Sequence, residues 1–376
     1  MRFLFTCGGT AGHINPAIAV ASRLKELLPD SKFLFVGAEG KMETELVPRE
    51  GYNIETIKIT NLQRKLSIKG IAHNMRSLAN VLTSRGRARR IISNFKPDCA
   101  IGTGGYVCYP VLRASSRMGV PSLVHESNAV PGLTTKMLEK YVSKVMVGFK
   151  GVESEYRNPQ KVIYTGTPVK EQFLKLDRVK ARRELGYSPD RPIVVSFWGS
   201  LGASGMNDVM EEFIELNSKS GSFYHIHATG GGESGCKSFL DKLSGRGVKL
   251  SEGGNCDIRP YIYDMPKVMA MADVVLCRAG ASTLNELIAM SKPAILVPSP
   301  YVTNNHQEEN AMVLKKAGGV KIIKENECTG KMLFDEVSGL IADKKDLENM
   351  EKNLKKLRIP DATDKIAEII LDLMKS

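Results

Sequence analysis

The feature that most constrains the fold of this chain is a regular alternation of short apolar runs with longer stretches of helical periodicity. Each apolar run is predicted to be a buried strand. The runs are RFLFTC, KFLFVG, DCAIG, SLVHE and KVMVG in the first half, and RPIVVSFW, SFYHIHATG, ADVVLC, KPAILVP and GVKII in the second. Apolar strands joined by crossover helices predict parallel sheets covered on both faces. The predicted fold class is therefore α/β, with two doubly wound domains.

The length of the chain supports this division. Its 376 residues are too many for one ordinary core, because single cores stop growing near roughly 250 to 300 residues. The first series of strands ends near YTGTPVKEQFLKL, and a charged segment containing YSPDRP precedes the second. We predict one domain over residues 1–164 and another over 165–360. Residues 361–376 are predicted to form a closing helix with one apolar face.

Composition narrows the function classes. No apolar run approaches the roughly 20 residues that a membrane span needs, and the initial FLFTC is far too short for a signal peptide, so we expect a cytoplasmic site of action. The seven cysteines form no CxxC or Cys/His cluster, which favours reduced thiols and argues against structural zinc. The net charge of +12 favours anionic partners. Nucleic acid ranks last among them, because no RNA-binding motif is present and only 6% of residues are aromatic.

Five glycine-rich turns follow predicted strands. They are CGGTAGH (7–13), GTGGYVCYP (102–110), WGSLGAS (198–204), TGGGESG (229–235) and RAGAST (278–283). None matches the phosphate-binding pattern GxxxxGK[ST] or the dinucleotide pattern GxGxxG. Any one of them alone is explained by a tight strand-to-helix turn. Together, in both halves, they predict a two-walled cleft for a phosphorylated ligand, because backbone N–H groups at such strand ends can approach an anion.

The first turn ends in His13. Asn15 is a good N-cap and Pro16 a good first helical residue, so we predict that His13 precedes the helix. Two interpretations of His13 stand side by side: a ring hydrogen-bonded to its own loop, or a general base at the mouth of a cleft.

Polar residues follow three further predicted strands. HESNAVPG (125–132) ends a strand with His, Glu and Asn, although Asn128 is also a suitable cap for the next helix. Glu286 lies on the helix after RAGAST and is either a carboxylate stabilised by the helix dipole or an acceptor for a ribose diol. YVTNNHQEENA adds His306, Gln307 and Asn310 ahead of another helix.

Several of these motifs together resemble one family. GGTAGHINPAIAVA, GTGGYVCYP, HESNAVPGLTTK, TGTPVK, WGSLGAS, AGASTLNEL and HQEENA follow the order and spacing of the MurG-type N-acetylglucosaminyltransferases of peptidoglycan synthesis, over nearly the whole chain. The resemblance implies a GT-B architecture, in which two Rossmann-like domains face each other across a cleft. It also implies inverting transfer of GlcNAc from UDP-GlcNAc to the C4 hydroxyl of MurNAc in lipid I, the undecaprenyl-pyrophosphoryl-MurNAc-pentapeptide, to form lipid II.

The resemblance also implies roles for residues. His13 is the leading candidate for the catalytic base and Glu126 the second. The positions that match the family's donor site are Thr10, Ala11, Gly12, Asn128, Lys170, Ser200, Ile262, Ala281, Ser282, Thr283, Leu284, Asn285, Glu286 and Gln307. The positions expected to bind the acceptor are Gly9, Gly104, Gly105 and Tyr106. No DxD-like acidic pair lies near the donor turns, so we expect neither metal nor cofactor, with helix N-termini and Lys170 neutralising the diphosphate.

The chain departs from the family's pattern at several positions. Lys170 replaces a usual arginine, and Trp198 and Leu201 stand in WGSLGA where GGSQGA is common. Ala11 replaces a glycine, and Thr167 stands where asparagine is commoner. These departures keep two alternatives open. One is a related transferase with another lipid acceptor, such as diacylglycerol, and the other is a non-catalytic nucleotide-sugar-binding scaffold of the cell-wall machinery.

Residues 61–90 combine an apolar helical face with many cations. Ile71, Met75, Leu78 and Leu82 share that face, which is explained either by core packing or by a reversible hold on an anionic membrane. We favour the membrane, because a lipid-bound acceptor requires it. The expected partners are therefore UDP-GlcNAc, lipid I, an anionic surface on the cytoplasmic side of the membrane and other cell-wall synthesis proteins.

Overall fold

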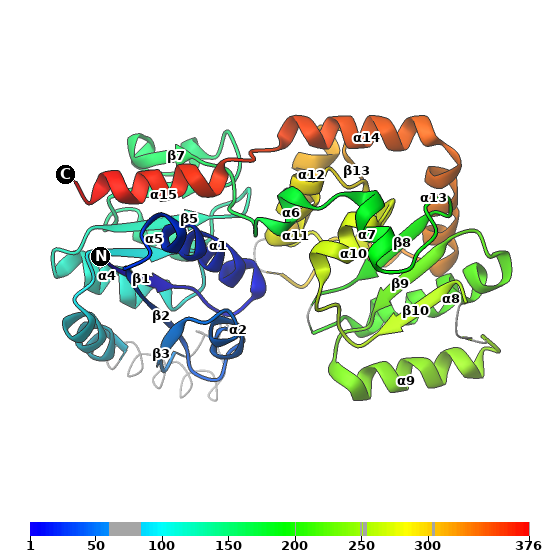
Figure 1. The fold of residues 1–376 in the computed structure, drawn as a ribbon, viewed down its shortest axis with the longest axis horizontal. Helices are drawn as coiled ribbons and strands as arrows, with labels where there is room; N and C mark the ends of the chain where they lie inside the picture. Colours follow the sequence, from blue (N-terminus) through cyan, green and yellow to red (C-terminus); the bar gives the residue numbers. More distant parts are fainter. Residues whose placement is uncertain (60–83, 200, 249, 251–253, 303–304, 376) are drawn as a thin grey trace. The chain divides into compact units, whose positions relative to one another are not determined.

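The computed structural model of the chain describes residues 1–59, 84–199, 201–248, 250, 254–302 and 305–375. It divides into two compact units, coloured along the sequence in Figure 1. Unit 1 comprises Met1–Lys170 and Ile359–Ser376, and unit 2 comprises Glu171–Arg358. Residues 165–170 thus belong with the first half of the chain.

Unit 1 is built around a fully parallel sheet of seven strands in the order β3-β2-β1-β4-β5-β6-β7. The strands are β1 (Arg2–Thr6), β2 (Lys32–Ala38), β3 (Asn53–Ile57), β4 (Cys99–Gly102), β5 (Ser122–Glu126), β6 (Lys144–Val147) and β7 (Val162–Tyr164). The helices are α1 (Ala11–Leu27), α2 (Glu43–Arg49), α4 (Cys108–Arg117), α5 (Leu133–Leu138) and α15 (Ala362–Leu373), with single 3₁₀ turns η1 (Glu153–Glu155) and η2 (Pro159–Lys161). The strand order reverses between β1 and β4, and ligands of doubly wound sheets bind beyond the carboxyl ends of strands at such a point.

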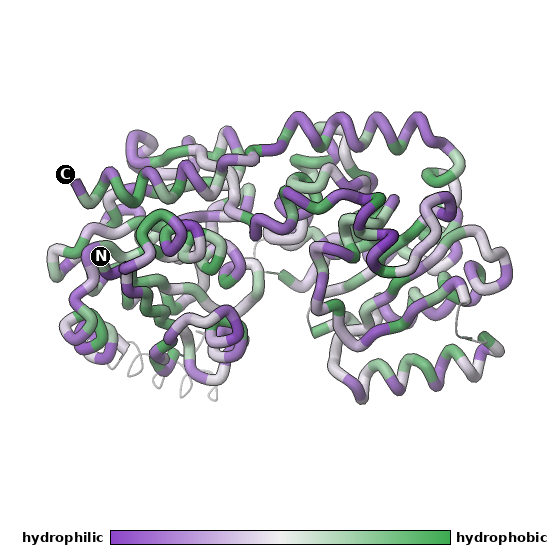
Figure 2. Tube along the Cα trace, viewed as in Figure 1, coloured by the Kyte–Doolittle hydropathy of each residue, from purple (hydrophilic) through white to green (hydrophobic). Residues whose placement is uncertain are grey.

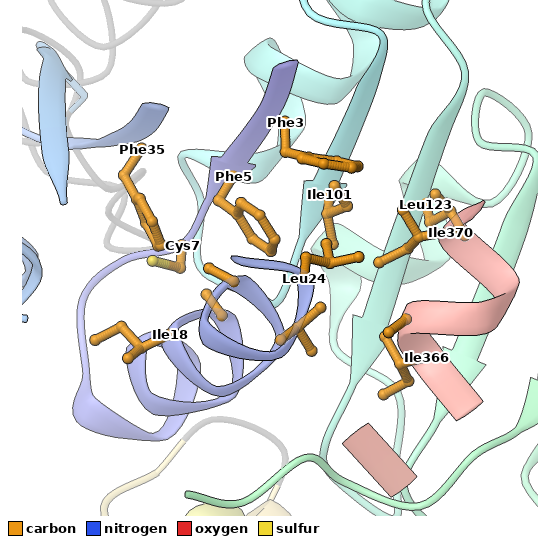
Figure 3. Packing of buried hydrophobic residues seen from close by; sticks show 14 of the residues in the cluster. Phe3, Phe5, Cys7, Ile18, Leu24, Phe35, Ile101, Leu123, Ile366 and Ile370 are labelled. Atoms are coloured by element: carbon orange, nitrogen blue, oxygen red, sulfur yellow. The ribbon is translucent and has the colours of Figure 1, made fainter. Parts of the chain in front are cut away.

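The core of unit 1 joins the two ends of the chain. Phe3, Phe5 and Phe35 are fully buried, and the rings of Phe5 and Phe35 stack with centroids 5.2 Å apart. Figure 3 shows Ile366 and Ile370 of α15 on the same cluster, beside Leu24 of α1. The last helix therefore completes the core that the first strand begins.

Unit 2 is built around a parallel sheet of six strands in the order β10-β9-β8-β11-β12-β13. The strands are β8 (Ile193–Phe197), β9 (Tyr224–Ala228), β10 (Cys256–Arg259), β11 (Val274–Cys277), β12 (Ala294–Leu296) and β13 (Val320–Ile322). The helices are α6 (Gln172–Lys175), α7 (Arg178–Glu184), α8 (Ser204–Ser220), α9 (Gly232–Gly245), α10 (Met265–Met271), α11 (Ala281–Met290), α12 (His306–Lys316), α13 (Gly330–Ala342) and α14 (Lys344–Leu357), with the 3₁₀ turn η4 (Glu325–Glu327). Here the strand order reverses between β8 and β11. In Figure 2, α14 is mostly hydrophilic.

The predicted α/β class with two doubly wound sheets is confirmed, and each predicted strand run contains a strand. The prediction does not include β3, β7 and β10, which lie at edges of the two sheets. Two of them, NIETI and CDIR, carry polar residues because an edge strand is less enclosed. Most of the basic, apolar segment 61–90 lies outside the described residues, since the structure describes it only from residue 84.

Candidate active site

The glycine turn that follows β1 is held by hydrogen bonds to neighbouring segments. The N–H of Gly8 donates to the carbonyl of Gly104 at 3.2 Å, and the N–H of Gly9 donates to Oε2 of Glu43 at 3.0 Å. Gly9 has a φ of 88°, in the left-handed region that favours glycine. The turn is therefore anchored on both sides, by the loop after β4 and by α2.

Helix α1 begins earlier than the Asn15-Pro16 pair predicts. It starts at Ala11, and the carbonyl of Thr10 accepts from the N–H groups of His13 at 3.0 Å and Ile14 at 3.2 Å. His13 therefore lies in the first turn of the helix and not ahead of it, so the predicted start was wrong. Pro16 lies inside the helix because its fixed φ is helical, and it withholds only one N–H from the ladder.

The His13 ring has a defined tautomer. Its Nδ1 atom lies 2.9 Å from the carbonyl oxygen of Gly8. A carbonyl only accepts, so Nδ1 carries the proton and Nε2 of the neutral ring keeps its lone pair. No described residue hydrogen-bonds to Nε2. The ring is thus bonded to its own loop and also presents a basic nitrogen, so the two interpretations from sequence are compatible.

The glycine turn after β4 packs directly on this ring and on the first turn. A Cβ atom on Gly104 would stand 2.3 Å from Cδ2 of His13, and one on Gly105 would stand 2.4 Å from the carbonyl oxygen of Gly8. Gly104 and Gly105 also have φ values of 121° and 91°. The next residue, Tyr106, is 54% exposed. The two turns thus lie side by side, beyond the paired residues Thr6 and Gly102 at the carboxyl ends of β1 and β4.

Glu126, at the end of β5, is fully occupied by its own loop. Its carboxylate is buried and accepts four hydrogen bonds: from the N–H of Asn128 at 3.0 Å, Nδ2 of Asn128 at 2.8 Å, the N–H of Gly132 at 2.9 Å and Oγ1 of Thr135 at 2.7 Å. All four donors bind the ionised form. The carboxylate therefore shapes the loop between β5 and α5 and holds the Asn128 side chain in place.

The neighbouring His125 has a structural role. Its Nε2 lies 2.9 Å from the carbonyl of Gly166, and its Nδ1 lies 3.2 Å from Oγ of Ser127. Burial lowers the pKa of this imidazole, so it is neutral at physiological pH.

In unit 2, the predicted donor residues of the segment 281–286 form the first turns of α11. Oγ of Ser282 donates to Oε1 of Glu286 at 2.9 Å, and Nδ2 of Asn285 donates to the carbonyl of Ala281 at 2.7 Å. Leu284 is fully buried and Glu286 is 8% exposed. The first N–H groups of a helix have no carbonyl partner within it, so this end can receive an anion.

The other predicted donor residues are dispersed. Ile262 follows β10 and is buried. Gln307 lies in the first turn of α12, where its Oε1 accepts from the N–H of Ser299 at 2.8 Å. Lys170 belongs to unit 1 and pairs there with Glu50 at 2.5 Å. Ser200 lies outside the described residues.

Trp198, one of the departures from the family's pattern, is a core residue. It is 3% exposed and packs among Met206, Met210 and Phe213. The guanidinium of Arg278 lies 5.9 Å from the centre of its ring. The substitution therefore enlarges the core beneath the glycine turn.

Two buried charged residues, one in each unit, were not predicted from the sequence. Glu43 is fully buried although acidic, and the available signal was its place on the apolar face of α2, one turn before Val47. Arg278 is also buried and donates to the carbonyl of Val297 at 3.0 Å and to Glu325 at 2.8 Å.

The described part of the chain contains neither a metal-binding cluster nor a membrane-spanning helix. No group of three or more His, Cys, Asp or Glu side chains is placed to hold a metal ion there. Within the same residues, no helix is long and apolar enough to cross a membrane.

Comparisons with known proteins cover nearly the whole chain. Residues 3–147 match the glycosyltransferase family 28 N-terminal domain, and residues 193–366 match the glycosyltransferase family 28 C-terminal domain. The UDP-N-acetylglucosamine--N-acetylmuramyl-(pentapeptide) pyrophosphoryl-undecaprenol N-acetylglucosamine transferase of Acetivibrio thermocellus is 43% identical, over 100% of this chain and 99% of its own. The protein of the same name from Ruminiclostridium cellulolyticum is 40% identical, over 100% of both chains.

Solved structures show the same fold. The crystal structure of Acinetobacter baumannii MurG aligns with a TM-score of 0.73 at 24% identity, over 99% of each chain. A UDP-GlcNAc 2-epimerase from Neisseria meningitidis, bound to UDP-GlcNAc, aligns with a TM-score of 0.67 at 17% identity, over 99% of this chain and 100% of its own. The GT-B architecture expected from the sequence motifs is thereby confirmed at the level of the fold.

Proposed function

The chain belongs to glycosyltransferase family 28, and from this membership we propose that it transfers GlcNAc from UDP-GlcNAc to the MurNAc unit of lipid I, forming lipid II for peptidoglycan. The observation that carries the proposal is the 43% identity, along the full length, to a protein named for this transfer. The departures at Trp198 and Lys170 do not argue for another acceptor. Trp198 is buried in the core, and Lys170 keeps its cationic group on the surface of unit 1.

The proposed chemistry is one displacement at the anomeric carbon of GlcNAc. The C4 oxygen of MurNAc forms a bond to this carbon as the bond to UDP breaks, and UDP leaves with the electron pair. The hydroxyl proton passes to a base on the enzyme. A single displacement inverts the anomeric configuration, so an α-linked donor gives a β-linked product.

We assign the base role to His13. Its Nδ1 proton is committed to the carbonyl of Gly8, which leaves Nε2 as the nitrogen that can take the proton. Glu126 fits a positioning role better, because proton uptake by this carboxylate would weaken four hydrogen bonds that the ionised form accepts. Through these bonds it would hold Asn128 toward the donor sugar.

Residues of unit 2 are proposed to hold the donor. The first N–H groups of α11 have no carbonyl partner within the helix and therefore suit the diphosphate, and the carboxylate of Glu286 suits the ribose hydroxyls. Ser282 orients this carboxylate by donating to Oε1. Gln307 uses its carbonyl oxygen for Ser299, so its amide nitrogen is the end offered to the sugar. These groups can neutralise a departing diphosphate without a metal ion.

The acceptor's pyrophosphate is assigned to the turn after β4. The N–H groups of Gly8 and Gly9 are already used within the protein. Those of Gly104, Gly105 and Tyr106 have no hydrogen-bond partner among the described residues. Gly9 would then shape the site through its backbone, while the second turn supplies the donors.

A lipid-linked acceptor places the protein at a membrane. We propose peripheral binding on the cytoplasmic side, carried by the net charge of +12 and by the basic segment 61–90. Retention on liposomes that contain anionic lipid, lost at high salt, is the expected result. Binding to neutral liposomes alone would contradict this part of the proposal. Other cell-wall synthesis proteins are the expected neighbours at that surface.

The identity of the acceptor is tested by supplying two lipids in separate reactions. Purified protein receives UDP-GlcNAc with a lipid I analogue or with diacylglycerol, and UDP release is measured. Release with the lipid I analogue alone supports the proposal. UDP release with diacylglycerol alone would indicate the alternative lipid transferase. Binding of UDP-GlcNAc with no UDP release in either reaction would indicate a scaffold.

A further inference from the structure

Glu43 carries a carboxylate that is completely buried in unit 1. Its two oxygens accept backbone hydrogen bonds from two different segments. Oε2 accepts from the N–H of Gly9, in the turn after β1, at 3.0 Å, and Oε1 accepts from the N–H of Ala38, at the end of β2, at 2.8 Å. Space is left for it by glycine at two positions, since a Cβ on Gly8 or on Gly37 would stand 2.4 Å from an atom of its side chain. Burying a carboxylate costs free energy unless hydrogen bonds compensate for the lost water. The two backbone N–H donors supply that compensation here.

The bond to Gly9 reaches His13 through one peptide group. The N–H that donates to Glu43 and the carbonyl that accepts from Nδ1 of His13 belong to the same peptide, the one between Gly8 and Gly9. That peptide is planar and its two ends point in opposite directions. Glu43, the peptide and the imidazole therefore form a continuous chain of two hydrogen bonds.

We propose that Glu43 is a positioning residue for His13, which it orients and polarises through the peptide between Gly8 and Gly9. This inference rests on the proposed role of His13 as the base. A negative charge on the N–H end makes the carbonyl a stronger acceptor, because successive hydrogen bonds polarise one another. The carbonyl then holds the Nδ1 proton more firmly and favours the positive charge that the ring gains when Nε2 takes the acceptor's proton.

The titratable neighbours of Glu43 do not compete for this role. Two titratable residues interact electrostatically with Glu43: Cys7, which follows β1, and Cys108, at the start of α4. Burial raises the pKa of Cys7 well above its usual value and raises that of Cys108 to about 12. Both thiols are neutral at physiological pH, so neither adds a charge beside the Glu43 side chain.

The test compares full-length Glu43→Gln with Glu45→Gln, an exposed glutamate on the same helix. Glutamine keeps the size and one acceptor oxygen but removes the charge. We expect kcat with the lipid I analogue to fall by roughly tenfold, which is typical when a residue that orients a functional side chain through hydrogen bonds is replaced. The KM for UDP-GlcNAc should stay within about twofold of wild type. The acid limb of the pH–rate profile should move to lower pH, since the imidazolium loses a favourable charge. Glu45→Gln should change none of these.

Nitrogen-15 NMR of histidine-labelled wild-type protein gives an independent readout. We expect His13 to carry its proton on Nδ1, and a proton on Nε2 instead would overturn the inference whether or not the Glu43 variant folds. An unchanged pH profile and kcat in folded Glu43→Gln would also overturn it. Failure of the proposed function has a different signature, because wild-type protein would then release no UDP with the lipid I analogue. Failure of the base role alone would leave His13→Ala with full turnover.

Discussion

The Nδ1 atom of His13 lies 2.9 Å from the carbonyl oxygen of Gly8, within the same glycine turn. This one contact assigns the proton on the ring, since the carbonyl can only accept. Nε2, on the other side of the ring, is therefore the basic nitrogen. The turn lies beside the point where the strand order of unit 1 reverses, between β1 and β4. The same hydrogen bond thus stabilises the loop and leaves Nε2 available for the base role that we propose for His13.

Replacement of His13 by alanine should remove most of the turnover. General bases contribute roughly 10² to 10⁴ in rate, so we expect kcat to fall by at least about 100-fold. UDP-GlcNAc binding, measured by calorimetry, should be nearly unchanged because the donor is assigned to other residues. Unchanged turnover would exclude His13 from the mechanism.

Gly104→Ala should impair both stability and catalysis. A side chain at a φ of 121° is strained by about 1 to 3 kcal/mol, and the new Cβ would press on the His13 ring. Gly119→Ala is the matched control, because Gly119 has a φ of 76° but no atom within 4 Å of the added Cβ. Urea unfolding should show a loss of stability in both variants. Only Gly104→Ala should lower kcat. Equal kcat values for Gly104→Ala and Gly119→Ala would show that the contact with His13 does not affect catalysis.

Glu286→Ala should weaken binding of UDP-GlcNAc. Hydrogen bonds to a charged group contribute about 1.5 to 3 kcal/mol, so a rise in Kd of roughly 10- to 100-fold is expected by calorimetry. Ser282→Ala removes only the bond that orients this carboxylate and should have a smaller effect. A larger effect of Ser282→Ala than of Glu286→Ala would contradict the assignment of the ribose contact.

Unit 2 should lose stability in acid because of two histidines on β9. The rings of His225 and His227 are buried and share Oγ of Ser196, at 2.8 and 2.7 Å. Burial lowers the pKa of His227 to about 3 and that of His225 well below its usual value. Below about pH 6.5 both histidines bind a proton in the unfolded chain but stay neutral in the folded unit. The free energy of unfolding therefore falls as the pH drops from there toward 3, by about 1.4 kcal/mol per pH unit for each ring.

The single tryptophan makes this measurable, because Trp198 is buried in unit 2. Urea unfolding followed by its fluorescence should show the steep loss between pH 6.5 and 4. His227→Asn should flatten the slope, even if its stability at pH 7.5 is lower. An equal slope in the two proteins would refute the assignment to the buried ring.

Whether an element of this fold can be predicted from sequence depends on how deeply its residues are enclosed and on whether their partners are close in sequence. Central strands such as β1 and β8 are enclosed on both faces and show as apolar runs, whereas the edge strands β3 and β10 carry polar residues and do not. The start of α1 was misplaced because Asn15-Pro16 is a strong local signal, which the bonds to the carbonyl of Thr10 override. Glu43 was missed because its partners, Gly9 and Ala38, come together only when β1 and β2 pair.

The most direct test of the proposed function is the product itself. Purified protein is incubated with UDP-GlcNAc and a lipid I analogue, and the lipid is examined by mass spectrometry and NMR. We expect a gain of one GlcNAc residue, attached in β configuration to the C4 oxygen of MurNAc, with release of UDP. An unmodified acceptor, or a product that retains the α configuration, would contradict it.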